Sequence, residues 1–202
     1  MDSPTIMTHE IQEQFDQSME LHNKLNGLIP VIEHVSQRLI SAYQNKGKMI
    51  IFGNGGSAAD AQHIAAEMLG HYRLERNAWP AIALTTNTSA LTAIGNDYGY
   101  ENIFSRQVEA WVRPGDVVIG ITTSGKSGNV VLGLKRALEL GAITVGLCGN
   151  EMSFLRPHCT YIINVPSHDT PRIQEVHILI GHIICQQVEE ALFASTTSSD
   201  RN

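Results

Sequence analysis

Apolar residues along the first 46 positions recur every three or four residues. Leu21, Leu25 and Leu28 follow this spacing, and the residues after them continue it. The spacing predicts two amphipathic helices, over residues 5–26 and 28–46, with a break near the sequence NGLIP. Residues 1–46 are therefore interpreted as a helical extension.

Beyond residue 47 the pattern changes to short, continuous apolar runs rich in isoleucine and valine. The runs cover residues 49–53, 81–85, 116–122, 143–149 and 161–165. Continuous apolarity indicates strands that are buried on both faces, as in a parallel sheet. Helical spacing separates most of the runs, at residues 57–70, in a pair across 88–111, and at 127–140 and 171–192.

Strands and helices that alternate in this way predict an α/β protein, an open three-layer α/β/α sandwich with right-handed crossovers. Ligands bind such folds beyond the carboxyl ends of the strands. We expect this domain to cover residues 47–193. Residues 194–202 are small and polar, and we expect them to form a disordered tail.

Composition narrows the possible partners and compartment. The 202 residues carry a net charge of −6 at pH 7, which favours neither nucleic acid nor an anionic membrane as a partner. No apolar run approaches the ~20 residues of a membrane span, and the polar start of the chain has no signal-peptide core. Cys148, Cys159 and Cys185 lack a CxxC spacing, so we expect reduced thiols and a cytoplasmic location.

The first predicted strand ends in the glycine-rich sequence GNGGSAADAQH. Gly53, Gly55 and Ala58 match the dinucleotide-binding pattern G-x-G-x-x-[GA]. The acidic residue that would bind the ribose is missing after the second strand, which argues against NAD(P). The glycines still allow backbone N–H groups to approach an anion or a hydroxyl at a helix N-terminus. Ser57 with Asp60 also forms an ordinary capping pair.

The sequence GITTSGKS, residues 120–127, matches the phosphate-binding P-loop pattern at every position. A P-loop also requires an acidic residue that ends an apolar strand and holds Mg²⁺, and no strand here ends in one. Gly120 also falls inside a predicted strand, too early for the loop. Four hydroxyls remain, those of Thr122, Thr123, Ser124 and Ser127. They indicate a neutral phosphate site at a helix N-terminus, with plain turn and capping chemistry as the alternative.

Three further positions carry polar chemistry. Asn96 and Asp97, in the sequence GNDYG, are either sugar ligands or ordinary turn residues between two helical stretches. His63 and Glu67 lie four residues apart on one helix face, where they can form a surface salt bridge, bind a metal or carry protons.

His182 lies in an apolar stretch of the last predicted helix and is either a core histidine or a functional one. Helix geometry puts Glu175 on nearly the same face as His182, whereas Gln174 lies about 80° around the helix. Spacing alone therefore pairs His182 with Glu175.

Four stretches of the sequence together match a known family. They are GNGGSAADAQHIAAE, LTAIGNDYGYENIFSRQVEA, RPGDVVIGITTSGKSGNV and DTPRIQEVHILIGH. They resemble the sugar isomerase (SIS) domain of bacterial phosphoheptose isomerases, from about residue 10 to 192. The resemblance implies a five-stranded parallel sheet, N-terminal helices that help to build a homotetramer, and active sites formed between subunits.

The resemblance also implies roles for individual residues. Glu67 and His182 match the family's catalytic acid–base pair. The ligands of a zinc ion seen in some members match His63, Glu67, Gln174 and His182. The substrate contacts match Asn54, Gly55, Gly56, Ser57, Glu67, Asn96, Asp97, Thr122, Thr123, Ser124, Ser127 and Gln174. The resemblance thus selects Gln174 where spacing alone favours Glu175, and Lys126 stands where the family has asparagine.

The implied reaction converts D-sedoheptulose 7-phosphate to D-glycero-D-manno-heptose 7-phosphate, the first step of nucleotide-activated heptose biosynthesis. A proton moves between C1 and C2 through an enediol, so one group must take the carbon-bound proton and another the oxygen-bound one. No nucleotide or redox cofactor is needed. The alternative is a non-catalytic SIS-domain regulator such as a DnaA initiator-associating protein, which lacks the acid–base pair.

Overall fold

The computed structural model describes residues 6–199, and its centre is a five-stranded parallel sheet. The strands are β1 (Met49–Gly53), β2 (Ala81–Ala83), β3 (Val117–Thr122), β4 (Ile143–Cys148) and β5 (Tyr161–Asn164). Their order in the sheet is β2-β1-β3-β4-β5, and every neighbouring pair is parallel. The predicted sheet is confirmed. Most predicted runs exceed the strands by one or two residues, because the terminal residues of those runs belong to the adjoining loops.

The described residues form seven α-helices. They are α1 (Ile6–His22), α2 (Ile29–Gln44), α3 (Gly56–Leu69), α4 (Thr88–Tyr98), α5 (Ser105–Trp111), α6 (Gly128–Glu139) and α7 (Thr170–Ser199). A short 3-10 turn, Leu25–Leu28, makes the predicted break between α1 and α2. Pro30 lies in the first turn of α2. Proline is tolerated there because backbone N–H groups of the first turn make no hydrogen bond within the helix.

The end of α7 differs from the prediction. The helix continues to Ser199, so residues 194–199 are helical and do not form the expected disordered tail. No glycine or proline follows Gly181 in the sequence, so nothing in the chain ends the helix after residue 192. Residues 200–202 of the expected tail lie outside the described residues.

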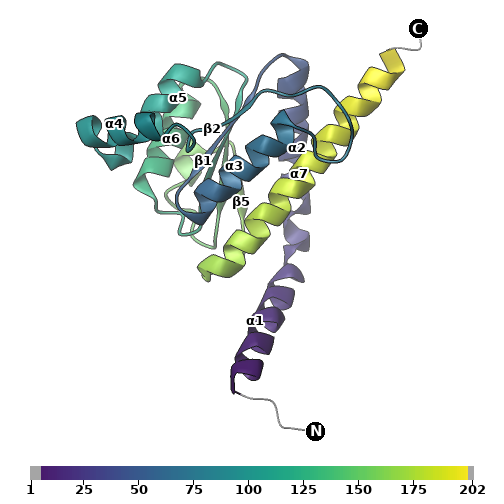
Figure 1. Cartoon of the computed structure of the whole chain (residues 1–202), viewed down its shortest axis with the longest axis vertical. Helices are drawn as coiled ribbons and strands as arrows, with labels where there is room; N and C mark the ends of the chain where they lie inside the picture. Colours follow the sequence, from purple (N-terminus) through teal and green to yellow (C-terminus); the bar gives the residue numbers. More distant parts are fainter. Residues whose placement is uncertain (1–5, 200–202) are drawn as a thin grey trace.

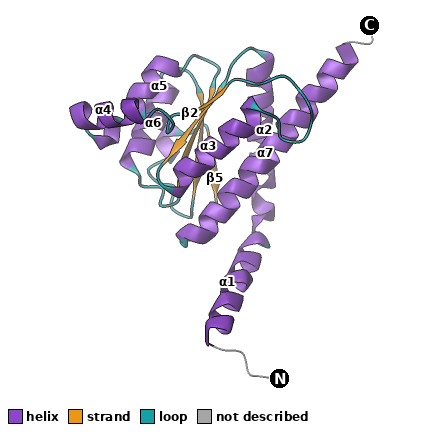
Figure 2. Ribbon diagram, viewed as in Figure 1, coloured by secondary structure: helices purple, strands orange, loops and turns teal. Residues whose placement is uncertain are grey.

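Helices cover both faces of the sheet, as the α/β/α prediction requires. Helices α4, α5 and α6 lie on one side, and α2, α3 and α7 lie on the other (Figure 1). Helix α1 extends away from this body, while the strands are enclosed between the two helical layers (Figure 2). Across the described residues, no helix is both long and apolar enough to cross a membrane.

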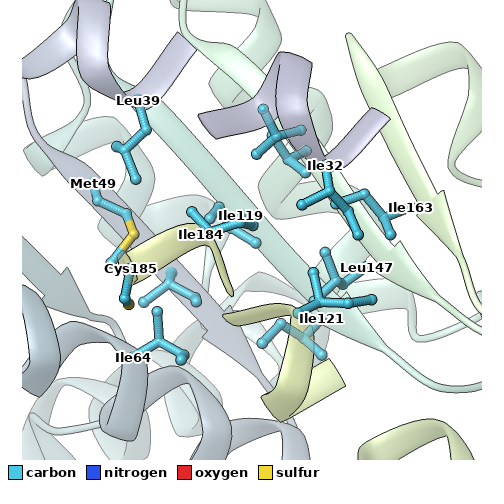
Figure 3. Close-up of a cluster of buried hydrophobic side chains, with 14 of the residues drawn as sticks. Ile32, Leu39, Met49, Ile64, Ile119, Ile121, Leu147, Ile163, Ile184 and Cys185 are labelled. Carbon is cyan, nitrogen blue, oxygen red and sulfur yellow. The ribbon is translucent and has the colours of Figure 1, made fainter. Parts of the chain in front are cut away.

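Each face of the sheet has its own apolar core. The core under α2, α3 and α7 includes Leu39, Met49, Ile64, Ile119 and Ile184 (Figure 3). The opposite core is built around the stacked rings of Phe52 and Phe104, whose centroids are 4.8 Å apart. Full burial of each such side chain stabilises the fold by about 1.5–3 kcal/mol, which fixes the strand ends and the loops that follow them.

Helices α3 and α7 lie side by side and run in the same direction. The Gln174 side chain lies against Gly56 at the start of α3, and Ile64 packs on Gly181 further along. A Cβ atom at either glycine would collide with its neighbour, so the two glycines permit this close approach. The packing places equivalent turns of the two helices opposite each other.

Candidate active site

The first part of the site is the predicted pair on α3. His63 Nε2 lies 3.1 Å from Glu67 Oε1, as their spacing of four residues requires. The His63 side chain is half exposed and the Glu67 side chain is mostly buried, at 49% and 22% exposure. Both groups therefore remain accessible to a small molecule or an ion.

Helix α7 adds the second imidazole. His182 Nε2 lies 3.3 Å from His63 Nε2, and the two rings meet edge to face with centroids 5.0 Å apart. His182 is only partly buried, so the interpretation of it as a core histidine is wrong. The structure therefore brings together His63, Glu67 and His182, which are predicted from two distant segments of the sequence.

The donor atoms of these three residues suit a metal ion. One ligand atom each from His63, Glu67 and His182 lies within 4.8 Å of the other two. Two imidazoles and a carboxylate are a donor set that zinc prefers, and catalytic zinc sites commonly use three protein ligands and leave one position open.

Gln174 and Glu175 take different places from those that helix spacing alone suggests. Glu175 accepts hydrogen bonds from Ser18 and Arg172, so it joins α7 to α1 and is not part of the cluster. Gln174 lies against Gly56. It is about 12 Å from His182 along the helix axis, given a rise of 1.5 Å per residue. The structure thus assigns Gln174 to the glycine-loop end of α7.

The glycine loop between β1 and α3 is a tight turn at a helix start. Gly55 has a φ of +55° and is the N-cap of α3, a backbone conformation that favours glycine. Ser57 lies inside the first turn of the helix and is buried, so it does not act as the expected N-cap. The first N–H groups of α3 therefore have no side-chain cap from the residue before them, which suits a polar ligand.

Asn54 follows Gly53 and points across the sheet. Its side-chain amide exchanges two hydrogen bonds of 2.9 Å with the amide of Asn129 on α6, and its oxygen accepts a third from the Tyr100 hydroxyl. These bonds join the loop after β1 to the helix after β3, where the strand order reverses. Open α/β sheets bind ligands at this point.

The loop after β3 gathers the predicted hydroxyls. Thr122 Oγ1 lies 2.9 Å from Ser127 Oγ and 3.4 Å from Ser124 Oγ. Gly125 turns the chain with a φ of +67°, and a Cβ atom there would collide with the carbonyl of Glu151. Gly120 lies in the middle of β3, as predicted, so the P-loop match does not describe a P-loop.

A polar cavity of about 230 Å³ adjoins this loop. Its lining residues are Thr123, Ser124, Lys126, Asn150, Glu151, Ser167, His168 and Thr170. A hydrogen bond from Ser153 and the Lys126 charge are among the causes that lower the pKa of Glu151, the hydrogen bond being the largest. The lining shows that the start of α7 lies beside the hydroxyl loop.

Asn96 and Asp97 lie in a helix, not in the expected loop. They occupy the last turn of α4, which ends at Gly99, where a φ of +86° terminates the helix. The Asn96 amide donates to Asp97 Oδ1 at 2.8 Å, and both side chains are exposed. The hydrogen bond from Tyr100 to Asn54 places this end of α4 near the glycine loop.

Sequence patterns missed one feature beside the cluster. The Tyr72 ring stacks on His182 with centroids 5.6 Å apart and an interplanar angle of 28°. Tyr72 belongs to residues 70–80, a segment without regular secondary structure that Arg76 and Glu189 hold in place. The only signal in the sequence was a carboxylate, Glu189, among the apolar positions of the last helix.

Burial also shifts the pKa of groups outside the His63, Glu67 and His182 cluster. Burial lowers the pKa of His177 to about 4 and raises the pKa of the Cys148, Cys159 and Cys185 thiols to about 12. The three cysteines are free thiols; Cys148 and Cys185 are buried, whereas Cys159 is only partly so. These residues therefore belong to the packing of the fold.

Known proteins resemble the chain over most of its length. A family model described as the SIS domain matches residues 15–149. A phosphoheptose isomerase of Clostridium acetobutylicum is 50% identical over 190 residues, which cover 93% of this chain and 97% of that protein. One from Geobacter sp. (strain M21) is 53% identical over 188 residues, covering 93% and 98%.

A solved structure agrees with these relatives. The phosphoheptose isomerase from Neisseria gonorrhoeae is 39% identical in sequence and superposes with a TM-score of 0.86. The match covers 91% of this chain and 99% of that chain. Sequence and fold therefore point to the same group of enzymes.

Proposed function

The chain belongs to the SIS domain family and, within it, to the phosphoheptose isomerases, and from this membership we propose its substrate and its catalytic residues. The chain is an aldose–ketose isomerase that acts on a sugar phosphate. The substrate is D-sedoheptulose 7-phosphate and the product is D-glycero-D-manno-heptose 7-phosphate. The fold and the relatives do not favour the regulator alternative.

One observation carries the catalytic assignment: Glu67 and His182 converge in one partly buried cluster. The reaction removes a proton from C1 and delivers one to the C2 oxygen, which forms the enediol. It then removes the O1 proton and delivers a proton to C2. A carboxylate and an imidazole within one sugar's reach can share these transfers, so we assign Glu67 and His182 to them.

The same cluster supports a zinc site. We assign His63, Glu67 and His182 as ligands, because their donor atoms already converge. Zinc bound there would compete with the proton-transfer roles of Glu67 and His182, and it would instead polarise the substrate carbonyl as a Lewis acid. Gln174 as a fourth ligand stays a prediction from the resemblance, because its side chain lies against Gly56 in this structure.

The phosphate and the sugar hydroxyls are assigned to the loops at the carboxyl edge of the sheet. The hydroxyls of Thr122, Ser124 and Ser127 point toward one another there, next to the polar cavity. Neutral hydroxyls and helix N–H groups suit a phosphate dianion. We assign the phosphate to Thr122, Thr123, Ser124 and Ser127. We assign the sugar contacts to Asn54, Gly55, Gly56, Ser57, Asn96, Asp97 and Gln174, with Glu67 reaching the reacting carbons.

Distance along the helices supports a substrate that lies across two subunits. Glu67 is about 16 Å along α3 from Gly56, and His182 is about 18 Å along α7 from Thr170, at 1.5 Å per residue. The phosphate loop and the cluster of one chain therefore lie at opposite ends of the α3–α7 pair. We propose that each site combines the two ends from neighbouring chains of a homotetramer, in which α1 and α2 contribute contacts.

Apolar side chains on α1 fit such an assembly. Met7, Ile11, Phe15 and Met19 recur every four residues and are 53% exposed or more. A helix that presents such a stripe normally buries it against a partner. The substrate is a cytoplasmic intermediate in this proposal, and the product enters nucleotide-activated heptose biosynthesis, for example for lipopolysaccharide.

The direct test is incubation of the purified protein with sedoheptulose 7-phosphate, followed by ¹H and ³¹P NMR. We expect the heptose aldose to form, and in D₂O we expect solvent deuterium at C2, because the enediol exchanges its proton. Fructose 6-phosphate serves as a control for substrate choice. If the folded protein did not convert sedoheptulose 7-phosphate, the proposed substrate and activity would be wrong.

A further inference from the structure

The segment between α3 and β2, residues 70–80, is irregular in backbone yet tightly held. The Glu189 carboxylate on α7 accepts hydrogen bonds from three successive N–H groups, those of Tyr72, Arg73 and Leu74, at 2.9, 2.7 and 2.9 Å. It also accepts one from Arg76 Nε at 2.9 Å. Both charged side chains are at most 5% exposed, so solvent does not compete for these bonds.

Arg76 joins the same segment to α3. Its guanidinium donates to the carbonyl of Glu67 at 2.8 Å and to those of Met68 and Gly70 at 3.0 and 3.1 Å. These carbonyls at the helix C-terminus have no partner within α3, and a cation there is favourable. The guanidinium also lies 3.7 Å from the Trp79 ring centroid, so it is fixed from both sides.

These contacts link the backbones that carry the two proposed catalytic groups. Arg76 bonds to the carbonyl of Glu67 itself, and Glu189 lies seven residues after His182, on nearly the same face of α7. Tyr72 is the side chain that completes the link. Its N–H group is held by Glu189 while its ring stacks on His182.

We propose that Tyr72, Arg76 and Glu189 are positioning residues for catalysis, which we call the Tyr72–Arg76–Glu189 anchor. The Arg76–Glu189 pair sets the spacing between α3 and α7 at the cluster, and the Tyr72 ring fixes the orientation of the His182 imidazole toward His63. The anchor does not touch the reacting atoms in this assignment. This inference rests on the proposed function, since it concerns the geometry of Glu67 and His182.

The test uses steady-state kinetics with sedoheptulose 7-phosphate. We expect Tyr72→Leu to lower kcat about tenfold while KM stays within about twofold, because a displaced imidazole impairs proton transfer and not anchoring of the sugar. Tyr72→Phe keeps the flat ring and should stay within about twofold of the wild-type kcat. Glu189→Gln keeps the shape of the side chain but removes its charge, and we expect it to lower kcat as well.

A matched control is available on β5. Tyr161 also stacks on a histidine, His34, with centroids 6.2 Å apart, and it lies outside the cluster. Tyr161→Leu should leave kcat unchanged. Equal kcat values for Tyr72→Leu and Tyr161→Leu would overturn the inference, and so would an equal loss in Tyr72→Phe and Tyr72→Leu.

Folding is checked by circular dichroism and thermal melting of every variant. Should Tyr72→Leu not fold, Tyr72→Met takes its place with the same expected loss, because its flexible unbranched side chain adapts to the space without supplying a flat ring. Glu67→Gln in the same assay separates the proposed catalytic function from the proposed positioning role of the Tyr72–Arg76–Glu189 anchor. If the wild type is active, Glu67→Gln is inactive and Tyr72→Leu behaves as wild type, only the positioning role fails. If the wild type shows no turnover, both fail.

Discussion

The Nε2 atoms of His63 and His182 lie 3.3 Å apart although the two residues are 119 positions apart in the sequence. At this distance one ring nitrogen donates and the other accepts, or both bind the same cation. Glu67 reaches the same point from the same helix as His63. The fold therefore brings two imidazoles and one carboxylate together in a small volume.

Replacement of the proposed acid–base pair should stop the reaction. We expect Glu67→Gln and His182→Asn each to lower kcat by at least about 10²-fold, the usual contribution of a positioned acid or base. Binding of the phosphate should change little. Coupled-assay kinetics and binding of the substrate by calorimetry would measure the two effects separately.

His9 and Glu13 supply the control for that prediction. They form another His–Glu contact four residues apart, fully outside the cluster on α1, at 3.5 Å. His9→Asn and Glu13→Gln should retain full activity. Wild-type activity in both Glu67→Gln and His182→Asn would show that proton transfer uses other groups.

The metal assignment predicts bound zinc in the protein as purified. We expect about one equivalent of zinc per chain by plasma mass spectrometry, and we expect His63→Ala to lose most of it, because a three-ligand site with one ligand removed binds zinc weakly. His71→Ala removes an exposed histidine outside the triad and is the control for nonspecific retention. Equal zinc content in the His63→Ala variant and the wild type would contradict the assignment.

A site shared between subunits predicts complementation of two inactive variants. Ser124→Asp places a negative charge where the phosphate is expected, and Glu67→Gln removes one of the two proposed proton-transfer groups. When the two are mixed, unfolded and reassembled, about a quarter of the sites should contain both intact halves. Recovery of activity to roughly that level supports the shared site, whereas activity no higher than that of the separate variants would place both halves in one chain.

Lys126 predicts an electrostatic contribution to substrate binding. Its side chain lines the polar cavity together with Thr123 and Ser124. Lys126→Asn should raise KM several-fold at low ionic strength with kcat unchanged, and the effect should shrink as salt screens the charge. The exposed Lys135 on α6 is a control, since Lys135→Asn should leave KM unchanged. A KM that does not respond to Lys126→Asn at any salt concentration would exclude this contribution.

His177 predicts how stability depends on pH. Burial lowers its pKa to about 4, whereas an unfolded histidine titrates near 6.5, so protons bind the unfolded chain first. The stability that this group contributes is complete above pH 6.5 and is lost as pH falls toward 4. The loss approaches about 1.4 kcal/mol per pH unit for one group.

Urea unfolding at several pH values would measure the effect of His177. His177→Leu should show a shallower decline than the wild type between pH 6.5 and 4, although it is less stable at pH 7 because the Cys148 carbonyl loses its contact. His34→Leu, at an exposed histidine, should keep the wild-type slope. Identical slopes in His177→Leu and the wild type would show that His177 is not the responsible group.

The pattern of apolar residues was sufficient for the sheet, whereas the members of the cluster came from the family resemblance. Continuous apolar runs identify strands because a strand buried on both faces has no polar side. Helix spacing placed His63 and Glu67 on one face of a helix but did not distinguish a surface salt bridge from a functional pair. The sequence did not predict how far the His182 side chain is buried, because apolar neighbours along the chain do not reveal which face of a helix is exposed.

Loop geometry was the second limit. Helix α4 is capped by Asn87 at its start and continues through Asn96 and Asp97 to Tyr98, although the local sequence favoured a turn. The place of Gln174 against Gly56 depends on how closely α3 and α7 pack, which is a tertiary property. Neither relation has a local pattern that would reveal it.

Irregular segments usually accept insertions and deletions among homologues, but residues 70–80 should not. Three consecutive N–H groups and the guanidinium of Arg76 all donate hydrogen bonds to the Glu189 carboxylate. A single inserted or deleted residue would displace some of these donors from the carboxylate. We therefore expect this stretch to keep a constant length across active members, and it is a poor choice for an engineered tag or a circular permutation.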